Sequence, residues 1–446
     1  MAGERAMNIP EQAKKAVEML QDNGYKAYLV GGCVRDFLMN KQPADIDITT
    51  DALPMQMMEI FSEYKIIPTG LKHGTVTVVI DLLPLEITTF RVDGIYTDNR
   101  HPSSVHFTRS LHEDLSRRDF TINAIAYNEI DGIIDYFDGE SDIKNKIIRC
   151  VGESDKRFKE DALRILRGLR FAAVLGFAIE DKTSKSMLQN KELIKNISVE
   201  RAATEIMKLL LGQGVKDVII NYTEVIAVVI PELLPMKGFK QSTPYHIYDI
   251  LTHSAVAVEN VPPEPCLRLA ALLHDIGKPQ TFSMGKDGTS HFYGHAAVSE
   301  KLSSNILNRL KLDNVTKQRV LTLIKYHDVQ IEADRKSVKK WLAKLSVEVF
   351  FQLIQLKRAD NFAQNPQYFY RQKQLDEIVT IANEIIYEGE CFTLKDLAVN
   401  GSDLIAIGIP KGKEVGITLK QLLVLVMENK IENKKESLLQ YLQNRL

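Results

Sequence analysis

Two aspartates one residue apart, Asp45 and Asp47, stand in the segment "DIDITT". Residues two apart in a β-strand face the same side, so both carboxylates would project together while Ile46 and Ile48 pack into the core. Such carboxylates repel each other unless a cation lies between them, and hard oxygen ligands suit Mg²⁺ shared with substrate phosphates. The pair therefore predicts a Mg²⁺ site, although an exposed acidic strand is the alternative interpretation of this pattern.

Two glycines, Gly31 and Gly32, end the preceding β-type run "AYLVGG", and Arg35 follows at the start of an expected helix. Glycines let backbone N–H groups come close to an anion, and the arginine adds a positive charge. The glycines and Arg35 are therefore predicted to hold nucleotide phosphates that the metal bridges. A tight turn is the simpler alternative, but the order strand, glycine pair, arginine and paired aspartates favours the phosphate site.

A third carboxylate would complete a two-metal site that aligns the attacking and leaving oxygens of a displacement. Glu86 in "LPLEITTFR" is the candidate. It alternates with Leu85 and Ile87, so its side chain leaves the apolar face of its strand. A plain surface glutamate remains the alternative.

Two arginine-rich motifs follow. In "RRDFTINAIAYN" (117–128), Arg117, Arg118 and Asp119 precede an apolar stretch whose pattern predicts a helix. Arg118 is expected to hold a triphosphate through charge-assisted hydrogen bonds, and Asp119 a ribose hydroxyl. The alternative is a capping cluster with solvated arginines.

The second motif, "EDALRILRGLRF" (160–171), predicts one continuous helix. Spacing by three drifts about 60° per step around a helix, so Asp161 and Arg164 are neighbours and Arg170 lies halfway round. A carboxylate beside a guanidinium complements the amino group and ring nitrogen of cytosine or adenine, and mismatches guanine and uracil. Asp161 and Arg164 are thus candidates for reading a base, and Arg167 and Arg170 for phosphates or RNA. A salt-bridged helix face is the usual meaning of such charges.

A second constellation occupies the later part of the chain. Its candidate metal ligands are His253, His274, Asp275, His295, His327 and Asp360. Imidazole and carboxylate ligands suit a transition metal such as Ni²⁺, Mn²⁺, Fe²⁺ or Zn²⁺. The order H…HD…H…H…D resembles the HD phosphohydrolase superfamily, which implies metal-dependent hydrolysis of phosphoesters. A domain that is not catalytic and only helps to clamp an RNA is the alternative.

The elements that must position these residues change along the chain. Short β-rich runs dominate up to about residue 148, and apolar residues at helical spacing dominate from about residue 155. The predicted class is α+β: a head with a mixed β-sheet, an all-α neck, an HD-type helical domain and a helical tail. The expected boundaries are 1–150, 151–240, 241–365 and 366–446.

Composition limits the choice of partners and location. The formal net charge of −1 excludes a global basic field, so RNA contacts must come from local patches. The four cysteines form no CxxC pair, which argues against zinc fingers and fits a reducing compartment. No apolar run approaches the ~18 residues of a membrane span, and the amphipathic N-terminus is unlike a signal peptide. A cytoplasmic protein with no membrane partner is expected.

Five segments together resemble one family: "LVGGCVRD", "DIDITT", "RVDGIYTDNRHPSSVHF", "RRDFTINA" and "EDALRILRGLRF". They are similar, in order and spacing, to the class II tRNA nucleotidyltransferases, which are the CCA-adding enzymes and related bacterial poly(A) polymerases. The resemblance covers about residues 25–215 and implies addition of C, C and A to the tRNA 3′ end from CTP and ATP with Mg²⁺. It implies that the nucleotide contacts are Gly32, Arg35, Arg118, Asp161, Arg164, Arg167 and Arg170.

Several alternatives remain at this level. Residues 91–109 have the composition of a mobile polar loop that CC-adding family members lack, which disfavours a CC-only enzyme but leaves A-only and poly(A) addition open. An HD-type phosphohydrolase with a second nucleotidyltransferase activity, and a non-catalytic nucleotide-sensing RNA-binding protein, are the other classes. The neck helix, the tail and a basic run are candidate tRNA contacts; that run comprises Arg335, Lys336, Lys339 and Lys340.

Overall fold

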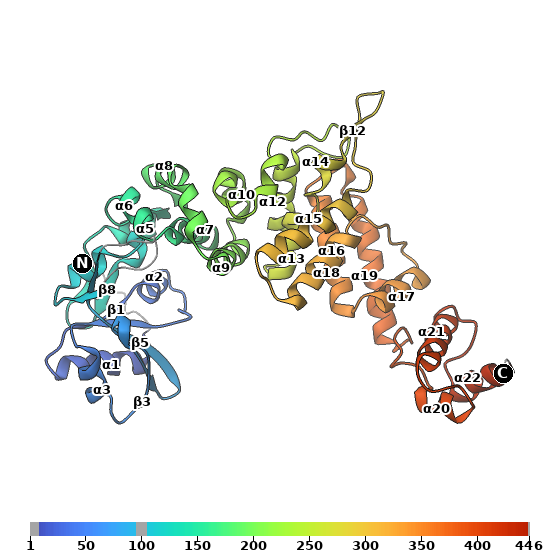
Figure 1. Cartoon of the computed structure of the whole chain (residues 1–446), viewed down its shortest axis with the longest axis horizontal. Coiled ribbons are helices and arrows are strands. Elements are labelled where there is room, and N and C mark those ends of the chain that lie inside the picture. The colour runs from blue at the N-terminus through green and yellow to red at the C-terminus, as the bar shows by residue number, and fades with distance from the viewer. Residues whose placement is uncertain (1–8, 95–104, 445–446) are drawn as a thin grey trace. The chain divides into compact units, whose positions relative to one another are not determined.

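The computed structural model describes residues 9–94 and 105–444. The chain divides into two compact units. Unit 1 comprises Met1–Leu234 with Arg309–Lys311, and unit 2 comprises Pro235–Asn308 with Leu312–Leu446. Strands gather in unit 1, whereas the described part of unit 2 is helical apart from one hairpin (Figure 1). The α+β class is confirmed, and the finer division at 1–150, 151–240, 241–365 and 366–446 stays a prediction.

A seven-stranded sheet forms the centre of the head, in the order β3-β4-β5-β2-β1-β8-β9. Its strands are β1 (Ala27–Val30), β2 (Asp47–Thr50), β3 (Lys65–Gly70), β4 (Thr75–Ile80), β5 (Leu83–Thr89), β8 (Ile125–Asn128) and β9 (Gly132–Asp135). Only the β2–β5 pairing is parallel within this sheet, so the sheet is mixed, as predicted.

The two faces of the sheet have different roles. Ile46 and Ile48 pack with helices α1 (Glu11–Asp22), α2 (Gly32–Leu38) and α3 (Pro54–Ile60) in one buried cluster. The opposite face packs on α4 (Leu111–Ser116). Because side chains alternate along β2, Asp47 points to the α4 face. The alternation predicted for "DIDITT" is therefore present, although Asp45 lies before β2 rather than within it.

The helix expected after Asp119 is wrong. Thr121–Asn123 form one 3₁₀ turn, and Ile125–Asn128 continue as strand β8. β8 pairs with β1 through Leu29 opposite Tyr127, so ladder hydrogen bonds and burial in the sheet outweigh the local apolar pattern.

The neck is helical. Its helices are α6 (Ser154–Glu160), α7 (Leu163–Leu175), α8 (Asp181–Gln189), α9 (Val199–Leu210), α10 (Val215–Asn221) and α11 (Thr223–Ile226). The single helix expected over 160–171 is wrong, because Asp161 is extended, at φ −137° and ψ 104°. Its carboxylate accepts a hydrogen bond from the backbone N–H of Leu163 at 3.0 Å, so the aspartate starts a second helix instead of continuing the first.

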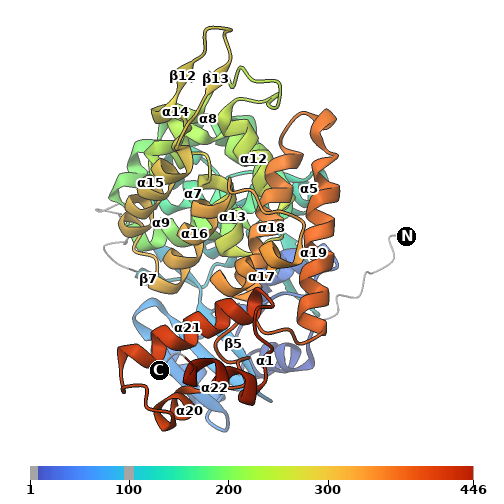
Figure 2. The same cartoon turned by 90° about the vertical axis from the view of Figure 1, so that its right-hand side faces the viewer.

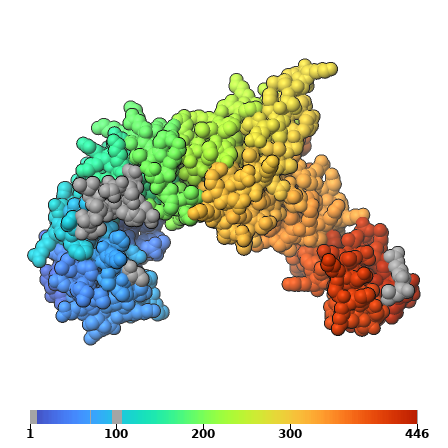
Figure 3. Space-filling model, viewed as in Figure 1, coloured from blue at the N-terminus to red at the C-terminus, as the bar shows by residue number. Residues whose placement is uncertain are grey.

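Unit 2 is built on a helical core. Its helices include α12 (Ile250–Asn260), α13 (Pro265–Leu273), α14 (Lys278–Thr281), α15 (His295–Arg309), α16 (Asn314–Tyr326), α17 (Arg335–Lys344), α18 (Val347–Phe362) and α19 (Arg371–Tyr387). A hairpin of β12 (Ser283–Met284) and β13 (Ser290–His291) extends beyond α14 and projects from this surface (Figures 2 and 3). The tail helices α20 (Gly401–Ala406), α21 (Lys413–Met427) and α22 (Lys435–Gln443) share a separate buried cluster. Among the described residues, no helix has the length and apolarity needed to cross a membrane.

Candidate active site and metal centre

Gly31 brings the predicted phosphate site together. Its φ of +79° lies in the left-handed region, and its N–H donates to the carbonyl of Ile125 at 3.2 Å. A Cβ at this position would lie 3.0 Å from Nη1 of Arg118 and 3.9 Å from Oδ2 of Asp47. The backbone conformation therefore favours glycine, and a larger side chain would press on the guanidinium of Arg118. The turn, the arginine and the aspartate, which the sequence predicted separately, share one location.

The predicted metal carboxylates lie on neighbouring strands. Asp47 is the register partner of Glu86 across the parallel β2–β5 pair, and Asp45 is exposed just before β2. Burial raises the pKa of Asp47, Arg118 opposes this, and the charges of Glu86 and Asp45 raise it further. Among the described residues, the ligand atoms of the histidine cluster of unit 2 lie within 4.8 Å of one another, whereas these three carboxylates do not form so compact a group. Their mutual repulsion, and the exposure of Asp45 and Glu86, fit an ion that completes its coordination with substrate oxygens.

A buried carboxylate that the sequence analysis missed orients the arginine pair. Asp114 has no exposed surface and accepts hydrogen bonds from Nε and Nη2 of Arg117 at 3.0 and 2.8 Å. It also accepts from Arg118 at 3.4 Å, from the backbone N–H of Arg91 at 3.3 Å and from the hydroxyl of Thr49 at 3.2 Å. Burial opposes its charge, but Arg117 and Arg118 lower the pKa of Asp114. The spacing of three and four residues to these arginines was the available signal.

Three predicted arginines surround one aromatic ring. The guanidinium carbons of Arg35, Arg167 and Arg170 lie 5.4, 5.3 and 4.4 Å from the ring centroid of Phe171. Each guanidinium is paired with a carboxylate: Arg35 with Asp36, Arg167 with Asp119 and Arg170 with Glu205. Several of these residues line a cavity of about 350 Å³ that Lys208 also borders. The structure thus gathers cations around an apolar surface next to the glycine turn.

Asp119 is held inside this arrangement. Its Oδ2 accepts a 2.7 Å hydrogen bond from Nε of Arg167, and its Oδ1 accepts one at 3.3 Å from the amide of Asn123. Burial opposes the charge, but Arg167 and Arg164 outweigh it and hold the pKa of Asp119 at about 2. These bonds occupy both oxygens, and the ribose contact expected for Asp119 stays a prediction.

Replacing Asp119 with asparagine is expected to lower the free energy of unfolding by about 2 kcal/mol at pH 7, the linkage value of a pKa lowered from 3.8 to about 2. The pKa is lower in the folded state, so this stabilisation is complete above about pH 4 and is lost as the pH falls through about 2. Urea denaturation at pH 7, 4 and 2.5 measures it, with exposed Glu63→Gln as the control. If the free energy of unfolding of Asp119→Asn falls as steeply between pH 4 and 2.5 as that of the wild type, the assignment is contradicted.

The predicted base-reading pair has other partners. Oδ2 of Asp161 lies 3.5 Å from Nη2 of Arg201, a residue that the sequence analysis missed. Arg164 donates from Nη1 to Glu160 at 2.8 Å and from Nη2 to the carbonyl of Arg117 at 2.8 Å. The two residues are neighbours, as predicted, since the backbone N–H of Arg164 donates to the carbonyl of Asp161 at 3.0 Å, but Asp161 lies before α7 rather than inside one helix with Arg164. Both side chains still border the neck beside the arginine cluster, and their role in base reading stays a prediction.

The structure describes the basic run of unit 2 but only the two ends of the polar loop over residues 91–109. β6 (Arg91–Asp93) pairs with β7 (Val105–Phe107), but the candidate loop residues Asp98, Asn99, Arg100 and Pro102 lie outside the described residues. In the basic run, Arg335 donates to Glu390 at 2.7 Å, Lys339 also pairs with Glu390, and Lys336 lies 3.4 Å from Glu428. Three of these four cations therefore pair with carboxylates of unit 2, and their role as tRNA contacts stays a prediction.

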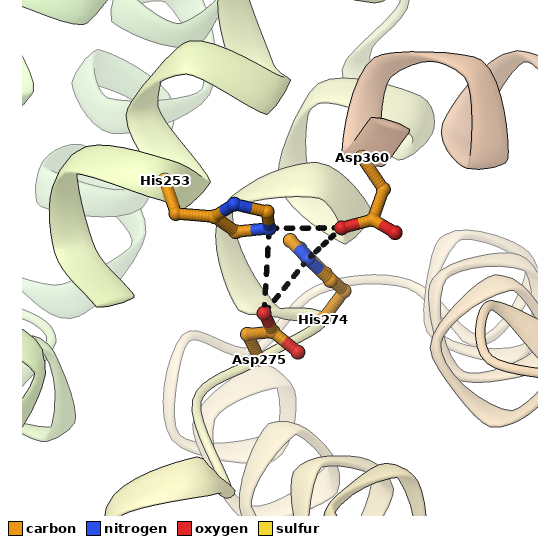
Figure 4. Close-up of side chains that lie close together, drawn as sticks. All are labelled: His253, His274, Asp275 and Asp360. Atoms are coloured by element: carbon orange, nitrogen blue, oxygen red, sulfur yellow. Dashed lines mark hydrogen bonds and ion pairs between the residues drawn. The ribbon is translucent and has the colours of Figure 1, made fainter. Parts of the chain in front are cut away.

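Four of the predicted HD ligands converge (Figure 4). Nε2 of His253, on α12, lies 2.8 Å from Oδ1 of Asp360, on α18, and 3.5 Å from Oδ2 of Asp275. Nε2 of His274 lies 3.2 Å from Oδ2 of Asp275 and 3.5 Å from Oδ1 of Asp360. Their ligand atoms all lie within 4.8 Å of one another, which is compact enough for one metal ion.

The other two predicted ligands form a second group through the same aspartate. Nε2 of His295 and Nε2 of His327 lie 3.4 and 3.7 Å from Oδ1 of Asp275. The two imidazole nitrogens are 3.1 Å apart. Asp275 thus presents one oxygen to each group, as a carboxylate that bridges two metal ions does.

Backbone carbonyls fix the orientation of the imidazoles. Each Nδ1 is directed at a carbonyl oxygen: His253 at Ala363, His274 at Ala271, His295 at Phe292 and His327 at Ile324, at 2.6–3.1 Å. If each Nδ1 carries the donated proton, each Nε2 presents a lone pair to the centre. Nε2 of His274 is buried without a hydrogen bond, and His295 and His327 face each other nitrogen to nitrogen. This donor set fits a transition metal, because a cation satisfies converging lone pairs.

Lys278 and His246, which the sequence analysis missed, border the cluster. Nζ of Lys278 lies 2.6 Å from Oδ2 of Asp275 and donates to Oε1 of Gln241 at 2.8 Å. The ring of His246 packs on His253 with centroids 5.2 Å apart. Burial and the charge of Lys278 lower the pKa of His246 to about 3, so this imidazole is neutral. The spacing of three residues from Asp275 was the only local signal for Lys278.

Comparisons with known proteins place the chain in a family. Family models match residues 27–149 (Poly A polymerase head domain), 176–234 (RNA and SrmB-binding site of polymerase A) and 288–442 (tRNA nucleotidyltransferase domain 2). The CCA-adding enzyme of Staphylococcus haemolyticus is 33% identical over 444 residues, covering 96% of both chains. That of Staphylococcus saprophyticus is 34% identical over 442 residues, covering 98% of both chains.

A solved structure extends the similarity to the fold. The crystal structure of the Bacillus stearothermophilus CCA-adding enzyme in complex with CTP is 31% identical, with a TM-score of 0.72, and covers 97% of this chain and 96% of that one. The Thermotoga maritima CCA-adding enzyme complexed with tRNA has the same fold at 20% identity and a TM-score of 0.58. The head carries the predicted glycine, arginine and aspartate motifs, and the relatives match this chain over nearly its whole length. The chain therefore belongs to the family of CCA-adding enzymes, which are nucleotidyltransferases.

Proposed function

We propose that this chain adds C, C and A to the 3′ end of tRNA, using CTP and ATP with Mg²⁺ and no nucleic-acid template. The observation that carries the proposal is the shared location of Gly31, Arg118 and Asp47, with Glu86 opposite Asp47 on the next strand. Full-length relatives named as CCA-adding enzymes support it. We place the activity in the cytoplasm, because the substrates are found there and the four cysteines are unpaired.

Each part of the head has a task in this reaction. Asp45, Asp47 and Glu86 would hold Mg²⁺, which when bound stabilises charge on the phosphoryl oxygens and lowers the barrier to displacement. Arg118 and Arg35 are placed to meet the triphosphate beside the backbone of Gly31 and Gly32, and Arg167 and Arg170 extend this positive surface along α7. Asp114 holds Arg118 in position from behind.

Incubating the protein with tRNA that lacks its 3′ end and with each labelled nucleoside triphosphate tests the proposal. CCA addition gives a product three nucleotides longer that requires both CTP and ATP. Extension by one adenosine on a tRNA ending in CC would indicate an A-adding enzyme, and long adenosine tails would indicate a poly(A) polymerase. Binding without extension would exclude the nucleotidyltransferase classes and leave the phosphohydrolase and the nucleotide-sensing RNA-binding protein.

We propose that Asp161 and Arg164 select the base, by accepting from the amino group and donating to the ring nitrogen of cytosine or adenine. Arg164 is engaged with Glu160, so its guanidinium must exchange that acceptor for the base. Arg201, beside Asp161, is placed to hold the carboxylate during this exchange.

Replacing Asp161 or Arg164 with alanine is expected to raise incorporation of UTP and GTP about 10-fold relative to CTP and ATP, because one unpaired buried group costs about 1–3 kcal/mol. Triphosphate binding should change less. Single-turnover incorporation of each nucleotide measures the effect, and Lys182→Ala, an exposed neck substitution, is the control. An even decrease for CTP and ATP with misincorporation still at background would show that the pair does not read the base.

We also propose that unit 2 is a metal-dependent phosphohydrolase of the HD type. The convergence of six imidazole and carboxylate ligands, with their outer nitrogens directed at carbonyls, carries this second proposal. The protein stripped of metal and reloaded with Ni²⁺, Mn²⁺, Fe²⁺ or Zn²⁺ should hydrolyse a 2′,3′-cyclic phosphate, and the stripped protein should not. Equal activity with and without a transition metal would exclude it.

A further inference from the structure

The guanidinium of Arg118 lies between two carboxylates. Its Nη2 is 3.4 Å from Oδ2 of Asp114, and this contact is an ion pair with a carboxylate that has no exposed surface. On the other side, Nη1 of Arg118 and Oδ2 of Asp47 lie 3.0 and 3.9 Å from the place that a Cβ on Gly31 would occupy. Among residues 9–94 and 105–444, Arg118 is paired with Asp114 and not with Asp47. The arginine therefore faces the candidate metal ligand while a different carboxylate holds it.

The two oxygens of Asp114 have different donors. Oδ1 accepts from Nε and Nη2 of Arg117 at 3.0 and 2.8 Å, and from the backbone N–H of Arg91 at 3.3 Å. Oδ2 accepts from the hydroxyl of Thr49 at 3.2 Å and from Arg118 at 3.4 Å. Arg117 makes the shorter pair, through two nitrogens, and balances the buried negative charge. The contact to Arg118 is the longest of these, so Asp114 holds this arginine in place without neutralising it.

Asp47 and Arg118 are close enough to affect each other's charge. Burial raises the pKa of Asp47, and among the neighbouring charges Arg118 has the largest effect, which lowers that pKa. A guanidinium that bonds directly to a carboxylate occupies the oxygens that a metal ion needs, so an arginine and Mg²⁺ compete for such a ligand. The bond to Asp114 keeps the guanidinium out of this competition.

We infer that Asp114 is a positioning residue whose Oδ2 holds Arg118 away from Asp47, so that Asp47 stays open to Mg²⁺ and Arg118 to the triphosphate. The inference rests on the proposed nucleotide addition and adds to it a determinant of the metal affinity of the head. If Arg118 is released, its guanidinium pairs with Asp47 and the ion must displace it. A buried carboxylate with a structural role alone would change the stability of the head but not its affinity for the ion.

Asp114→Asn removes this hold selectively. The amide oxygen can replace Oδ1, where three N–H groups converge, and this places the amide NH₂ where Oδ2 was. The NH₂ can donate to the hydroxyl oxygen of Thr49, because that hydroxyl can donate to the carbonyl of Thr88 at 3.3 Å. Arg118, by contrast, meets a donor in place of its acceptor. The variant therefore keeps the contacts of Arg117 and releases Arg118.

Two measurements test the inference. The Mg²⁺ concentration for half-maximal addition of CMP to tRNA lacking its 3′ end should be about 10-fold higher for Asp114→Asn, the factor that loss of one hydrogen bond to a charged group supplies. The dissociation constant of Mn²⁺ should rise by the same factor. It is measured by electron paramagnetic resonance in protein that also carries His274→Ala and Asp275→Ala, so that unit 2 does not take up the ion.

Two comparisons assign the effect to the arginine. Glu113→Gln is the matched control, because it removes a carboxylate from an exposed position of the same helix, and both values should stay at those of the wild type. Arg118→Gln removes the guanidinium itself. Adding Asp114→Asn to Arg118→Gln should therefore change neither the Mg²⁺ requirement nor the affinity for Mn²⁺.

Arg117→Gln keeps the inference testable if Asp114→Asn does not fold, which circular dichroism reports. Without the charge of Arg117, Asp114 should hold Arg118 more tightly, so KM for CTP should rise while Mn²⁺ binding does not weaken.

Three results would overturn the inference: wild-type values in Asp114→Asn, weaker Mn²⁺ binding in Arg117→Gln, or a shift that persists when Asp114→Asn is added to Arg118→Gln. The last result would mean that Asp114 acts on Asp47 through Thr49 and strand β2 instead. If the wild type adds no nucleotide, the proposed function fails, and the Mn²⁺ titrations still decide whether Asp114 holds Arg118 away from Asp47.

Discussion

Alanine at Asp47 is expected to lower the rate of nucleotide addition about a thousandfold or more. Asp47 lies beside Glu86 on the parallel strand pair and close to Arg118 at the glycine turn. Loss of a metal ion that stabilises the displacement removes several kcal/mol, and about 4 kcal/mol corresponds to a factor of about 10³. Asp45→Ala should act in the same direction. Single-turnover addition of CMP to tRNA lacking its 3′ end measures the effect.

Binding of tRNA should be nearly unchanged in both variants, because tRNA contacts in this family are expected along the neck and tail rather than at the carboxylates. Gel-shift titration of tRNA measures this. The control is Glu63→Ala, an exposed carboxylate in the turn before β3, which should add nucleotides at the wild-type rate. Addition at the wild-type rate by Asp47→Ala in saturating Mg²⁺ would remove the metal-site assignment.

The double substitution His274→Ala and Asp275→Ala is expected to abolish transition-metal binding by unit 2. Asp275 offers one oxygen to each ligand group, so its loss disrupts both, and His274 supplies a buried nitrogen that lacks a hydrogen bond. Elemental analysis after dialysis against Ni²⁺ or Mn²⁺ measures the bound metal. Phosphoester hydrolysis should disappear with it. CCA addition should persist, because the head supplies its own carboxylates.

The control for this experiment is His291→Ala, which removes a histidine of unit 2 from strand β13, outside the cluster. It should retain its metal. CCA addition by the double variant shows that the head remains folded, and circular dichroism reports on the helices of unit 2. Equal metal content in the double variant and the wild type would mean that the histidines are structural and that the domain is a scaffold.

The elements that followed a local rule could be predicted from the sequence. The alternation along "DIDITT" predicted that Ile46 and Ile48 are buried, and both lie in the core. The mixed sheet of the head was also predicted. Two local patterns were misleading. The apolar run after Asp119 becomes strand β8 because it fills a position beside β1, a partner about a hundred residues away. The charged run from Glu160 breaks at Asp161 because its side chain competes for a backbone N–H.

In the candidate sites, too, residues recognisable by type and order were predicted, whereas partners brought in from distant segments were not. The histidines and aspartates of unit 2 were identified by type and order, and the structure brings all six into two adjoining groups. Two partners of the candidate nucleotide contacts were not identified: Glu205, which pairs with Arg170, and Arg201, which lies beside Asp161, both come from α9, far along the chain. Ion pairs between distant helices depend on packing angles that no short motif encodes. Their functional roles remain predictions for the variants above.

Asp114 connects three parts of the head. One buried carboxylate bonds the first residue of β6, the hydroxyl of Thr49 on β2 and the guanidinium of Arg118. A displacement of the β6–β7 ribbon that withdraws the Arg91 N–H leaves this carboxylate short of one donor. Its remaining donors are then the hydroxyl of Thr49, on the strand that carries Asp47, and the guanidinium groups of Arg117 and Arg118. The Asp114 carboxylate therefore joins the ribbon both to strand β2 and to Arg118, and the backbone N–H of Phe90 adds a second link by donating to the carbonyl of Thr50 at 2.6 Å.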